Sequence, residues 1–449
     1  MYGSRYLTEQ NNALQIDGME ATKLAEQYGT PLYIMAEREL TDRLATVRDA
    51  FLEKYPNTYA SFASKALTIG AVYQQVVKHG LGIDVVTGGE LFIARKAGVP
   101  AERIYFHGSN KSTQDLRYAV EEGVGKIVID HYGEIAQLNQ IAAEACQTVQ
   151  VLIRIVPQVI GGAHTKIQTG GVDTKFGFST HDDSYLEAVE AVLAAEHLVL
   201  LGIHCHVGSQ IQEIELFERT ARTMMGFVET IRERTSFIAS EVNLGGGFGI
   251  AYMQDDQPLD FEQTMERVMS IIDEETTRLA IDRPRIGIEP GRWVVANAGT
   301  TLYTVGAIKE VQGVRTYLSV DGGMADNIRP ALYGAVYETV IANRIEGETR
   351  HVTVVGAACE SGDLVAESAD LAEPVSGDTL AVFGTGAYNY SMASNYNQFL
   401  RPAVVFVNQG ESREVVRRQT YDDLIQCDLG LKNIPSSSEL KSFKKHPRN

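Results

Sequence analysis

Eight short apolar runs, separated by stretches with helical periodicity, place the strongest constraint on how this chain can fold. The runs are rich in isoleucine and valine and are too short for helices. They are unbroken rather than alternating, as expected for strands buried on both faces of a parallel sheet. Eight repeats of strand, helix and parallel strand predict a (β/α)8 barrel of the α/β class, with an open doubly wound sheet as the alternative. The runs lie at 59–64, 82–86, 103–108, 126–130, 149–156, 198–207, 241–247 and 285–291.

The rhythm changes after residue 300, where strand-like runs such as "RTYLSVDGG" and "PAVVFVNQG" follow one another mostly without helices between them. This pattern predicts a C-terminal antiparallel β-domain, a barrel or a sandwich. The N-terminal run "NALQIDG" is typical of a strand, and we expect it to join the same domain. We therefore predict a barrel over 36–284, a β-domain formed by 1–35 and 285–435, and a flexible polar tail over 436–449.

Composition excludes several classes of partner. The formal net charge of −18 argues against a nucleic-acid-binding protein, because polyanions require a basic face. No apolar run reaches the ~18 residues that a membrane span needs, and the N-terminal residues lack the apolar core of a signal peptide. Four widely spaced cysteines without a Cys-x-x-Cys pair indicate neither a disulfide framework nor a zinc module. We expect a cytoplasmic enzyme without nucleic-acid or membrane partners.

Unusual residues gather at the predicted C-terminal ends of the strands, where a (β/α)8 barrel carries its chemistry. The first strand leads into Lys65, whose amine we expect to be partly desolvated and therefore nucleophilic; the alternative is a lysine that extends to water. "GGGFG" (245–249) follows the seventh strand and "EPGR" (289–292) the eighth. Such segments let backbone N–H groups approach an anion, which indicates a phosphate site, although glycine-rich turns are also common without a ligand.

The segment "HCHVGSQ" (204–210) offers a choice between a metal and an organic ligand. His204 and His206 are two residues apart and point to the same side of a strand, so bidentate metal binding is conceivable. No further ligand cluster completes the set in the sequence, and we predict no metal. An imidazole stacked on an aromatic ring, beside a lysine, a phosphate site and Glu289, instead indicates pyridoxal phosphate. A carboxylate at the ring nitrogen suits decarboxylation better than racemisation.

The chain carries a series of long motifs: "ASKA", "GIDVVTGGEL", "FHGSNKS", "TKFGF", "HCHVGSQI", "NLGGGFGI", "EPGRWVVANAG", "DGGMADNIRPALY", "CESGD" and "GTGAYNYSMASNYN". With them it resembles the diaminopimelate decarboxylases, members of the alanine-racemase-fold (fold type III) pyridoxal-phosphate decarboxylases, from about residue 28 to about residue 425. The resemblance implies an alanine-racemase-type barrel and a pyridoxal 5′-phosphate cofactor. It also implies decarboxylation of meso-2,6-diaminopimelate to L-lysine and CO2, the last step of lysine biosynthesis.

The resemblance assigns cofactor contacts residue by residue. It implies that Lys65 forms the Schiff base, that His206 stacks on the pyridine ring, and that Glu289 pairs with the ring nitrogen. The glycine loop, the serine of "HVGS" and the "EPGR" turn would contact the phosphate. Asp84 and Glu90 would lie near the lysine and the ring. The implied cofactor-binding residues are Lys65, Asp84, His206, Ser209, Gly245, Gly246, Gly247, Glu289, Pro290, Gly291, Arg292 and Tyr388.

Substrate contacts follow from the same resemblance. It implies catalytic roles for Lys65, His206 and Cys359, with Cys359 as the acid that reprotonates Cα. Arginines and a glutamate would recognise the distal amino-acid group of diaminopimelate, since arginine forks suit carboxylates. In this family "CESGD" reaches the site of the neighbouring subunit, which implies a homodimer with active sites shared across the interface. The implied substrate-binding residues are Arg292, Arg329, Tyr333, Glu360 and Tyr388.

Two other functions are the alternatives. A sibling decarboxylase would act on ornithine, arginine or a carboxylated polyamine, and such relatives lack the glutamate of "CESGD" and the arginine of "DNIRPALY". A catalytically silent paralogue would have lost the lysine or the cysteine, and both are present here. Leu67, where many relatives carry asparagine, and Trp293, where serine is frequent, depart from the family pattern without removing a group that the reaction needs. The glycine-rich stretch 159–177 is a candidate for a loop that closes over the site.

Overall fold

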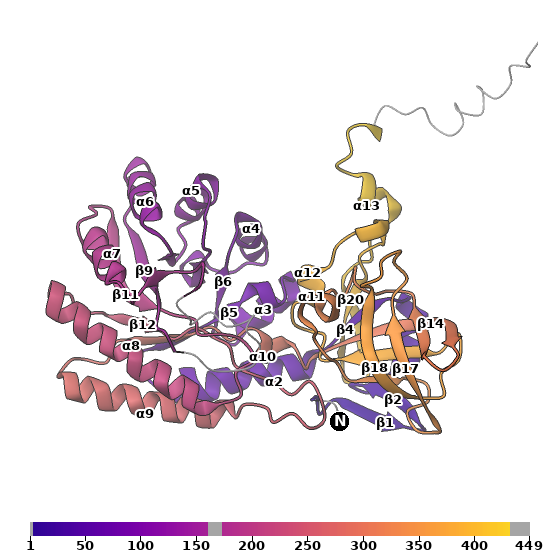
Figure 1. Cartoon of the computed structure of the whole chain (residues 1–449). Helices are drawn as coiled ribbons and strands as arrows, with labels where there is room; N and C mark the ends of the chain where they lie inside the picture. Colours follow the sequence, from indigo (N-terminus) through magenta and orange to yellow (C-terminus); the bar gives the residue numbers. More distant parts are fainter. Residues whose placement is uncertain (1–2, 160–172, 432–449) are drawn as a thin grey trace, which may run out of the picture.

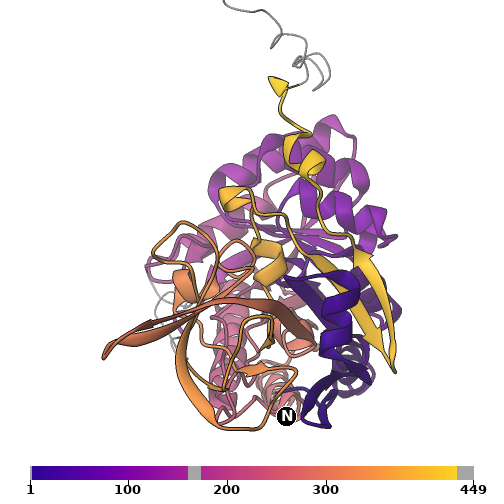
Figure 2. The same cartoon turned by 90° about the vertical axis from the view of Figure 1, so that its right-hand side faces the viewer.

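The computed structural model describes residues 3–159 and 173–431 (Figure 1). The predicted tail over 436–449 and most of the predicted closing loop over 159–177 lie outside these residues. The described part forms a barrel of alternating strands and helices with a β-rich domain beside it. Figure 2 shows the orange strands of this second domain in front of the purple and magenta barrel. None of the described helices is long and apolar enough to cross a bilayer.

Eight parallel strands close into a ring, which confirms the predicted (β/α)8 barrel and excludes the open sheet. Each strand is hydrogen-bonded in parallel to the next barrel strand along the chain. The last strand then pairs with the first and completes the ring. The barrel strands are β5 (Thr58–Ala63), β6 (Gly82–Val85), β7 (Ile104–Phe106), β8 (Lys126–Ile129), β9 (Val149–Val156), β11 (Leu198–His204), β12 (Glu241–Asn243) and β13 (Arg285–Ile288), and β10 (Phe178–Ser179) pairs with β9 as a short addition.

The crossover helices each bury one face against the strands. In α6 (Tyr132–Glu144), Ile135, Leu138 and Ala142 recur at helical spacing and are buried. Local sequence sets the helix ends: Ser112 accepts a hydrogen bond from the Asp115 N–H at the start of α5, and Gly123 ends that helix in the left-handed conformation. The other barrel helices are α2 (Glu37–Val47), α3 (Gly70–Lys78), α4 (Gly88–Lys96), α5 (Thr113–Glu122), α7 (Ser184–Leu193), α8 (Ile214–Thr235) and α9 (Phe261–Leu279).

The second domain is built on one nine-stranded sheet, in which β4 (Leu32–Ala36) joins the N-terminal segment to C-terminal strands. β4 pairs in parallel with β20, and β15 pairs in parallel with β17. The other pairs described in this sheet are antiparallel, as predicted. The remaining strands of the sheet are β14 (Gly299–Val311), β15 (Arg315–Val320), β16 (Thr339–Ile341), β17 (Thr349–Val355), β18 (Leu364–Ala372), β19 (Thr379–Phe383), β20 (Ala403–Asn408) and β21 (Glu411–Val416).

The domain boundaries differ from the predicted ones. The barrel extends beyond the predicted end at residue 284, because β13 must pair with both β12 and β5 to close the ring. At the N-terminus, β1 (Leu7–Gln10), β2 (Ala13–Ile16) and β3 (Met19–Glu20) form a small sheet of their own, followed by α1 (Ala21–Tyr28). The strand predicted from "NALQIDG" is present as β2, which pairs with β1 and β3. It joins the β-domain as expected, because the Leu14 N–H donates to the Ala342 carbonyl at 2.7 Å and Leu14 and Ile16 pack in one core with Leu302.

Short helices connect the two domains. Figure 1 shows α11 (Arg329–Tyr333) and α12 (Asn389–Met392) between barrel helix α3 and the β-domain. α10 (Arg292–Val295) follows the last barrel strand directly. α13 (Tyr421–Ile425) begins at a capping box of Thr420 and Asp423 and leads the chain away from both domains.

A buried ion pair crosses the barrel at the N-terminal ends of its strands. Lys126 Nζ, on β8, lies 2.5 Å from Glu241 Oε1, on β12, and both side chains are only 4% exposed. The Tyr59 hydroxyl also donates to this carboxylate, and the lysine amine lies 4.2 Å from the Tyr59 ring centroid. The pair holds two strands that are not neighbours in the sheet, so it fixes the width of the barrel below the site.

We predict that Lys126→Met lowers the free energy of unfolding by about 3–5 kcal/mol, because Glu241 becomes a buried charge without its partner. Urea unfolding followed by circular dichroism measures the change. The matched control is Lys309→Met on the exposed edge of β14, which should change stability by no more than about 0.5 kcal/mol. Replacing Glu241 with Gln as well should recover part of the loss. Equal unfolding free energies of Lys126→Met and Lys309→Met would contradict the prediction.

Candidate active site

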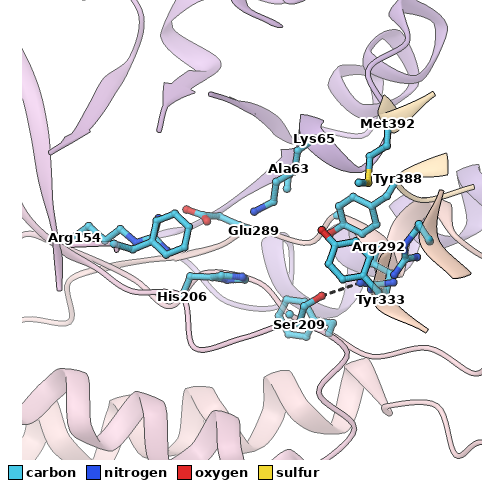
Figure 3. Close-up of a pocket in the computed structure, with 15 residues that line it drawn as sticks. Ala63, Lys65, Arg154, His206, Ser209, Glu289, Arg292, Tyr333, Tyr388 and Met392 are labelled. Carbon is cyan, nitrogen blue, oxygen red and sulfur yellow. Dashed lines mark hydrogen bonds between the residues drawn. The ribbon is translucent and has the colours of Figure 1, made fainter. Parts of the chain in front are cut away.

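A cavity of about 320 Å³ opens at the C-terminal ends of the barrel strands, facing the β-domain (Figure 3). The cavity lies at the strand ends where the sequence predicts the site. A second hollow of about 260 Å³ adjoins it and shares Lys65, His206 and Glu289 with it. The larger cavity is lined by Ala63, Lys65, Arg154, Phe176, His206, Ser209, Gly247, Phe248, Glu289, Gly291, Arg292, Arg329, Tyr333, Tyr388 and Met392.

Lys65 lies on a single 3-10 turn, Ser64–Ala66, that follows β5 directly. The turn is closed by the Leu67 N–H, which donates to the Ser64 carbonyl at 2.9 Å, and the Tyr388 N–H donates to the Ala66 carbonyl at 2.7 Å. Figure 3 shows the lysine amine pointing into the cavity. The side chain is exposed there rather than partly desolvated as the apolar run suggested. The turn therefore presents the amine to whatever enters the cavity.

Two loops meet at the phosphate site that the sequence predicts. Gly247 has φ +104°, and a Cβ on it would lie 2.5 Å from the Gly208 carbonyl oxygen, so only glycine fits. The Ile211 N–H donates to the Gly247 carbonyl at 2.9 Å, which ties the "HVGS" loop to the glycine loop. Ser209 and Gly247 line the cavity together. Gly245 and Gly246 act through their backbone: the Gly245 carbonyl accepts the Glu289 N–H, and the Gly246 N–H donates to His206.

His204 and His206, the two histidines of "HCHVGSQ", contact different groups. β11 ends at His204, whose Nε2 lies 3.1 Å from Glu289 Oε1. His206 lies in the following loop, and its Nδ1 accepts the Gly246 N–H at 3.2 Å. Burial, reinforced by the positive charge of Lys65, lowers the pKa of His206 well below its usual value. The ring facing the cavity is therefore neutral at physiological pH.

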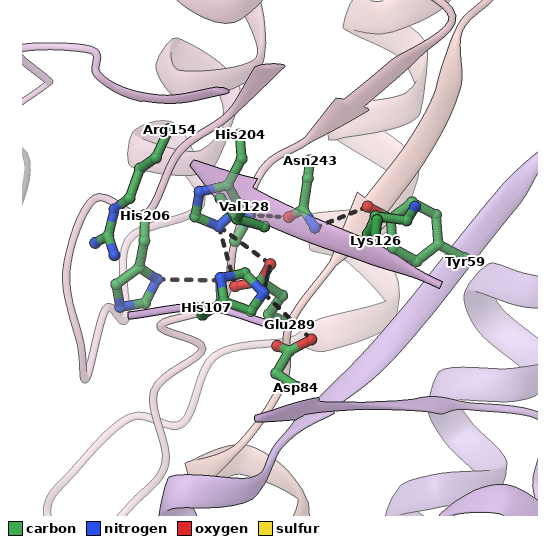
Figure 4. Close-up of polar contacts among 12 residues, drawn as sticks. Tyr59, Asp84, His107, Lys126, Val128, Arg154, His204, His206, Asn243 and Glu289 are labelled. Carbon is green, nitrogen blue, oxygen red and sulfur yellow. Dashed lines mark hydrogen bonds and ion pairs between the residues drawn. The ribbon is translucent and has the colours of Figure 1, made fainter. Parts of the chain in front are cut away.

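Glu289 lies at the centre of a buried polar cluster with His107, His204 and Asp84 (Figure 4). His107 Nε2 lies 3.4 Å from Glu289 Oε1 and 3.5 Å from Asp84 Oδ1. Burial acts to lower the pKa of His107, but the two carboxylates together raise it above its ordinary value. Ligating atoms of His107, His204 and Glu289 lie within 4.8 Å of one another. His204 Nε2 and Glu289 Oε2 are within hydrogen-bond distance at 3.2 Å, whereas His107 Nε2 and Glu289 Oε1 have no hydrogen-bond partner among the described residues. The absence of a metal stays a prediction.

Arginines line the opposite side of the cavity, next to the β-domain. Arg292 begins α10, and its Nη2 donates to Ser209 Oγ at 3.0 Å. Arg329 begins α11, and it is 7% exposed. The Tyr388 ring lies against both guanidinium groups, with centroid distances of 4.8 Å to Arg292 and 5.2 Å to Arg329. Tyr333 lines the same wall. The cavity therefore has a carboxylate–imidazole end and a guanidinium end, with Lys65 between them.

Some predicted residues lie elsewhere in this chain. Cys359 and Glu360 are exposed on the connection between β17 and β18 and are absent from the cavity wall. The Cys359 N–H donates to Asn397 Oδ1, and Glu360 Oε2 accepts from the Tyr396 hydroxyl. Pro290 acts through its carbonyl, which accepts the Ala63 N–H at 3.3 Å, and the Glu90 carboxylate accepts the Val86 N–H at 2.7 Å rather than facing the cavity.

Sequence analysis did not anticipate Arg154 and His107, which line the cavity or the adjoining hollow. A signal existed for both. Arg154 is the charged residue of the strand β9, between Ile153 and Ile155, where a charge among buried apolar residues requires a reason. His107 follows the third barrel strand at the end where barrels place their chemistry. Phe176 and Phe248 form apolar wall, and nothing in the sequence separates such residues from ordinary core.

Fold and site together define a class of (β/α)8-barrel enzyme with a lysine in a cavity at the C-terminal ends of its strands. Residues 40–296 match the family model described as "Pyridoxal-dependent decarboxylase, pyridoxal binding domain". This match spans more than half of the chain and contains the strands that form the cavity, as well as Lys65 and Glu289.

Relatives narrow the class. The chain is 48% identical over 424 residues to diaminopimelate decarboxylase of Bacillus subtilis, covering 94% of this chain and 97% of the relative. It is 41% identical over 420 residues to that of Staphylococcus aureus, covering 93% and 98%. The crystal structure of diaminopimelate decarboxylase from M. jannaschii in complex with L-lysine superposes with a TM-score of 0.90 at 33% identity, covering 97% and 99%. The chain belongs to the diaminopimelate decarboxylase family of pyridoxal-dependent decarboxylases.

The arginine wall depends on a buried carboxyl group just before α11. Asp326 is 4% exposed; the Tyr303 hydroxyl donates to its side chain, and the Tyr33 hydroxyl donates to its backbone carbonyl. The Gly323 N–H donates to Asp326 Oδ1 at 2.9 Å. Burial raises the pKa of Asp326 to about 7, against the opposing effect of these hydrogen bonds. This residue fixes the segment from which Arg329 and Tyr333 project.

We predict that Asp326→Asn gains stability relative to the wild type as the pH rises through 7. The folded pKa of about 7 exceeds the unfolded value of ~3.9, so the stabilisation from the protonated form is full below about pH 4 and is lost as pH rises through 7. Between pH 6 and 8 the difference in unfolding free energy should shift by about 1 kcal/mol in favour of the variant, measured by urea unfolding. If the difference in unfolding free energy between the variant and the wild type did not change with pH, the raised pKa of Asp326 would be wrong.

Proposed function

We propose that this chain decarboxylates meso-2,6-diaminopimelate to L-lysine and CO2 with pyridoxal 5′-phosphate as cofactor. The observation that carries the proposal is the cavity in which Lys65 lies between Glu289 at one end and Arg292 and Arg329 at the other. Relatives at 41–48% identity that carry the name diaminopimelate decarboxylase support the substrate. Four cysteines free of disulfides support a cytoplasmic location.

The residues present fit the cofactor. Glu289 lines the cavity, and its buried Oε1 has no hydrogen-bond partner among the described residues, so a protonated pyridine nitrogen would complete its contacts. The cradle at Gly247 would be filled by any Cβ, and Ser209 and Arg292 add a hydroxyl and a positive charge for a phosphate. Lys65 would hold the aldehyde carbon, and neutral His206 would lie against the ring. When bound, the cofactor supplies an electron sink for the electron pair left at Cα when CO2 departs.

The chain's own residues would orient the substrate and move the proton. Arg329 and Tyr333 would hold the distal carboxylate, which fixes the reacting end near Lys65. Glu289, braced by His204 and His107, would place its carboxyl group at the ring nitrogen and so favour the protonated ring. The proton that replaces CO2 on Cα would come from the Cys359 thiol.

A second copy of the chain would complete the site. Cys359 and Glu360 are exposed on a connection that does not reach this chain's own cavity. Their side chains fit the missing acid and the missing partner for the distal amino group. We therefore propose a homodimer in which each copy supplies these two residues to the cavity of the other.

Lys65→Ala should abolish turnover and the visible absorbance of the lysine-attached cofactor, because no other amine on the turn can replace it. The wild type, offered meso-diaminopimelate, ornithine and arginine in parallel, should release lysine from the first and turn over neither of the others. The control Lys78→Ala, on the exposed face of α3, should keep both signals. Turnover by Lys65→Ala would refute the mechanism, and preference for ornithine or arginine would refute the substrate.

A mixing experiment tests the shared site. Lys65→Ala and Cys359→Ala should each be inactive alone, and the mixture after subunit exchange should regain activity, because some mixed dimers contain one intact cavity. Lysine release from meso-diaminopimelate is the measurement, with a mixture of Lys65→Ala and Glu289→Gln, two lesions in the same cavity, as the matched control that should stay inactive. No recovery in the first mixture, despite exchange shown by native mass spectrometry, would refute the shared site.

A further inference from the structure

The hydroxyl of Tyr252 lies between the two arginines of the cavity wall. Arg292 Nη1 and Arg329 Nη1 both donate to it, the second at 3.3 Å. Tyr252 follows the glycine loop and is outside every motif assigned to the cofactor or the substrate. Its oxygen has two lone pairs, so it can accept one hydrogen bond from each guanidinium at once.

The backbone and ring of Tyr252 are fixed independently of the arginines. Asp256 Oδ2 accepts the N–H groups of Tyr252 and Met253 at 2.8 and 3.0 Å, which closes a tight turn. The ring stands edge-to-face against Tyr337, with centroids 5.5 Å apart. The hydroxyl is therefore delivered by a prearranged scaffold and does not depend on the arginines to hold it.

The two arginines have different second partners. Arg292 also donates to Ser209 in the phosphate loop, and Arg329 also donates to the Tyr337 hydroxyl at 3.1 Å on the substrate side. The Tyr252 hydroxyl thus contacts both Arg292, at the proposed phosphate site, and Arg329, at the proposed carboxylate site. Two guanidinium groups repel each other, and an oxygen between them reduces that repulsion.

The electrostatics of the hydroxyl agree with this role. Burial acts to raise the pKa of Tyr252, yet the charges and hydrogen bonds of Arg292 and Arg329 together lower it below its ordinary value. The two cations therefore favour the phenolate form of Tyr252, whose oxygen can accept from both guanidinium groups.

We propose that Tyr252 is a positioning residue that couples the phosphate-binding Arg292 to the carboxylate-binding Arg329, so that cofactor and substrate anions are held at a fixed separation. This inference rests on the proposed function. Without the hydroxyl, each guanidinium keeps only its own second partner, and the separation of the two anion sites is no longer set by a common atom. Both affinities should weaken, whereas the bond-breaking step should change little.

Tyr252→Phe tests the coupling, because it removes the hydroxyl and keeps the ring that packs on Tyr337. We expect the KM for meso-diaminopimelate to rise about tenfold, the size of one lost hydrogen bond to a charged group, with kcat changed less than about threefold. The dissociation constant of pyridoxal phosphate, titrated into the apoprotein by visible absorbance, should rise at least about threefold.

Tyr337→Phe is the matched control, since it removes a hydroxyl that accepts from Arg329 and donates to Asn389 but has no hydrogen bond to Arg292. It should raise the KM and leave the cofactor dissociation constant unchanged. Wild-type values in Tyr252→Phe, equal loss of cofactor affinity in both variants, or a fall in kcat with an unchanged KM would each overturn the inference. Failure of the proposed function is distinguishable, because it would appear as absence of turnover or of cofactor absorbance in the wild type.

Discussion

Closure of the parallel sheet between its first and last strands is the constraint on which the site depends. β13 aligns Ile286–Ile288 with residues 58–60 of β5, and the Ala63 N–H donates to the Pro290 carbonyl just beyond the pairing. This register brings Lys65 and Glu289, more than 200 residues apart in the chain, to the rim of one cavity. An open sheet with the same strands would leave them on opposite edges. The proximity of the lysine and the carboxylate is therefore a product of ring closure rather than of local sequence.

The cavity is electrically asymmetric, and its asymmetry follows from the two domains. Barrel strands supply the end with Asp84, Glu289 and two imidazoles, buried where water cannot screen them. The helices at the domain junction supply the end with Arg292 and Arg329. A ligand with a protonatable ring and anionic groups would place its ring at Glu289 and its anions at Arg292 and Arg329, while Arg154 adds a positive charge at the carboxylate end. The orientation of the ligand in the cavity therefore depends on where the domain junction places the short helices α10 and α11.

Much of the fold was predictable because buried parallel strands leave unbroken apolar runs, and all eight appear in the barrel. Pairing partners were less predictable: periodicity does not reveal that β4 pairs in parallel with β20, since that contact joins segments about 370 residues apart. Site residues carried by motifs, such as Lys65 and Gly247, line the cavity as expected. Tyr252 could not be anticipated, because a tyrosine after a turn has no distinguishing pattern, and its importance arises only where two arginines from different helices converge on it.

One carboxylate, that of Asp363, holds both the exposed segment that carries Cys359 and the buried segment that leads to Arg329. Asp363 Oδ2 accepts the Ala358 N–H at 2.7 Å, next to exposed Cys359, and its Oδ1 accepts the Met324 N–H at 2.6 Å, in the segment that leads to Arg329. The two backbones approach so closely that a Cβ on Gly323 would lie 2.2 Å from this carboxylate. In the proposed dimer, Arg329 serves its own cavity and Cys359 serves the other. The distance between the segment that carries Cys359 and the segment that leads to Arg329 is therefore set within one chain by hydrogen bonds to Asp363. Displacement of either segment must displace the other.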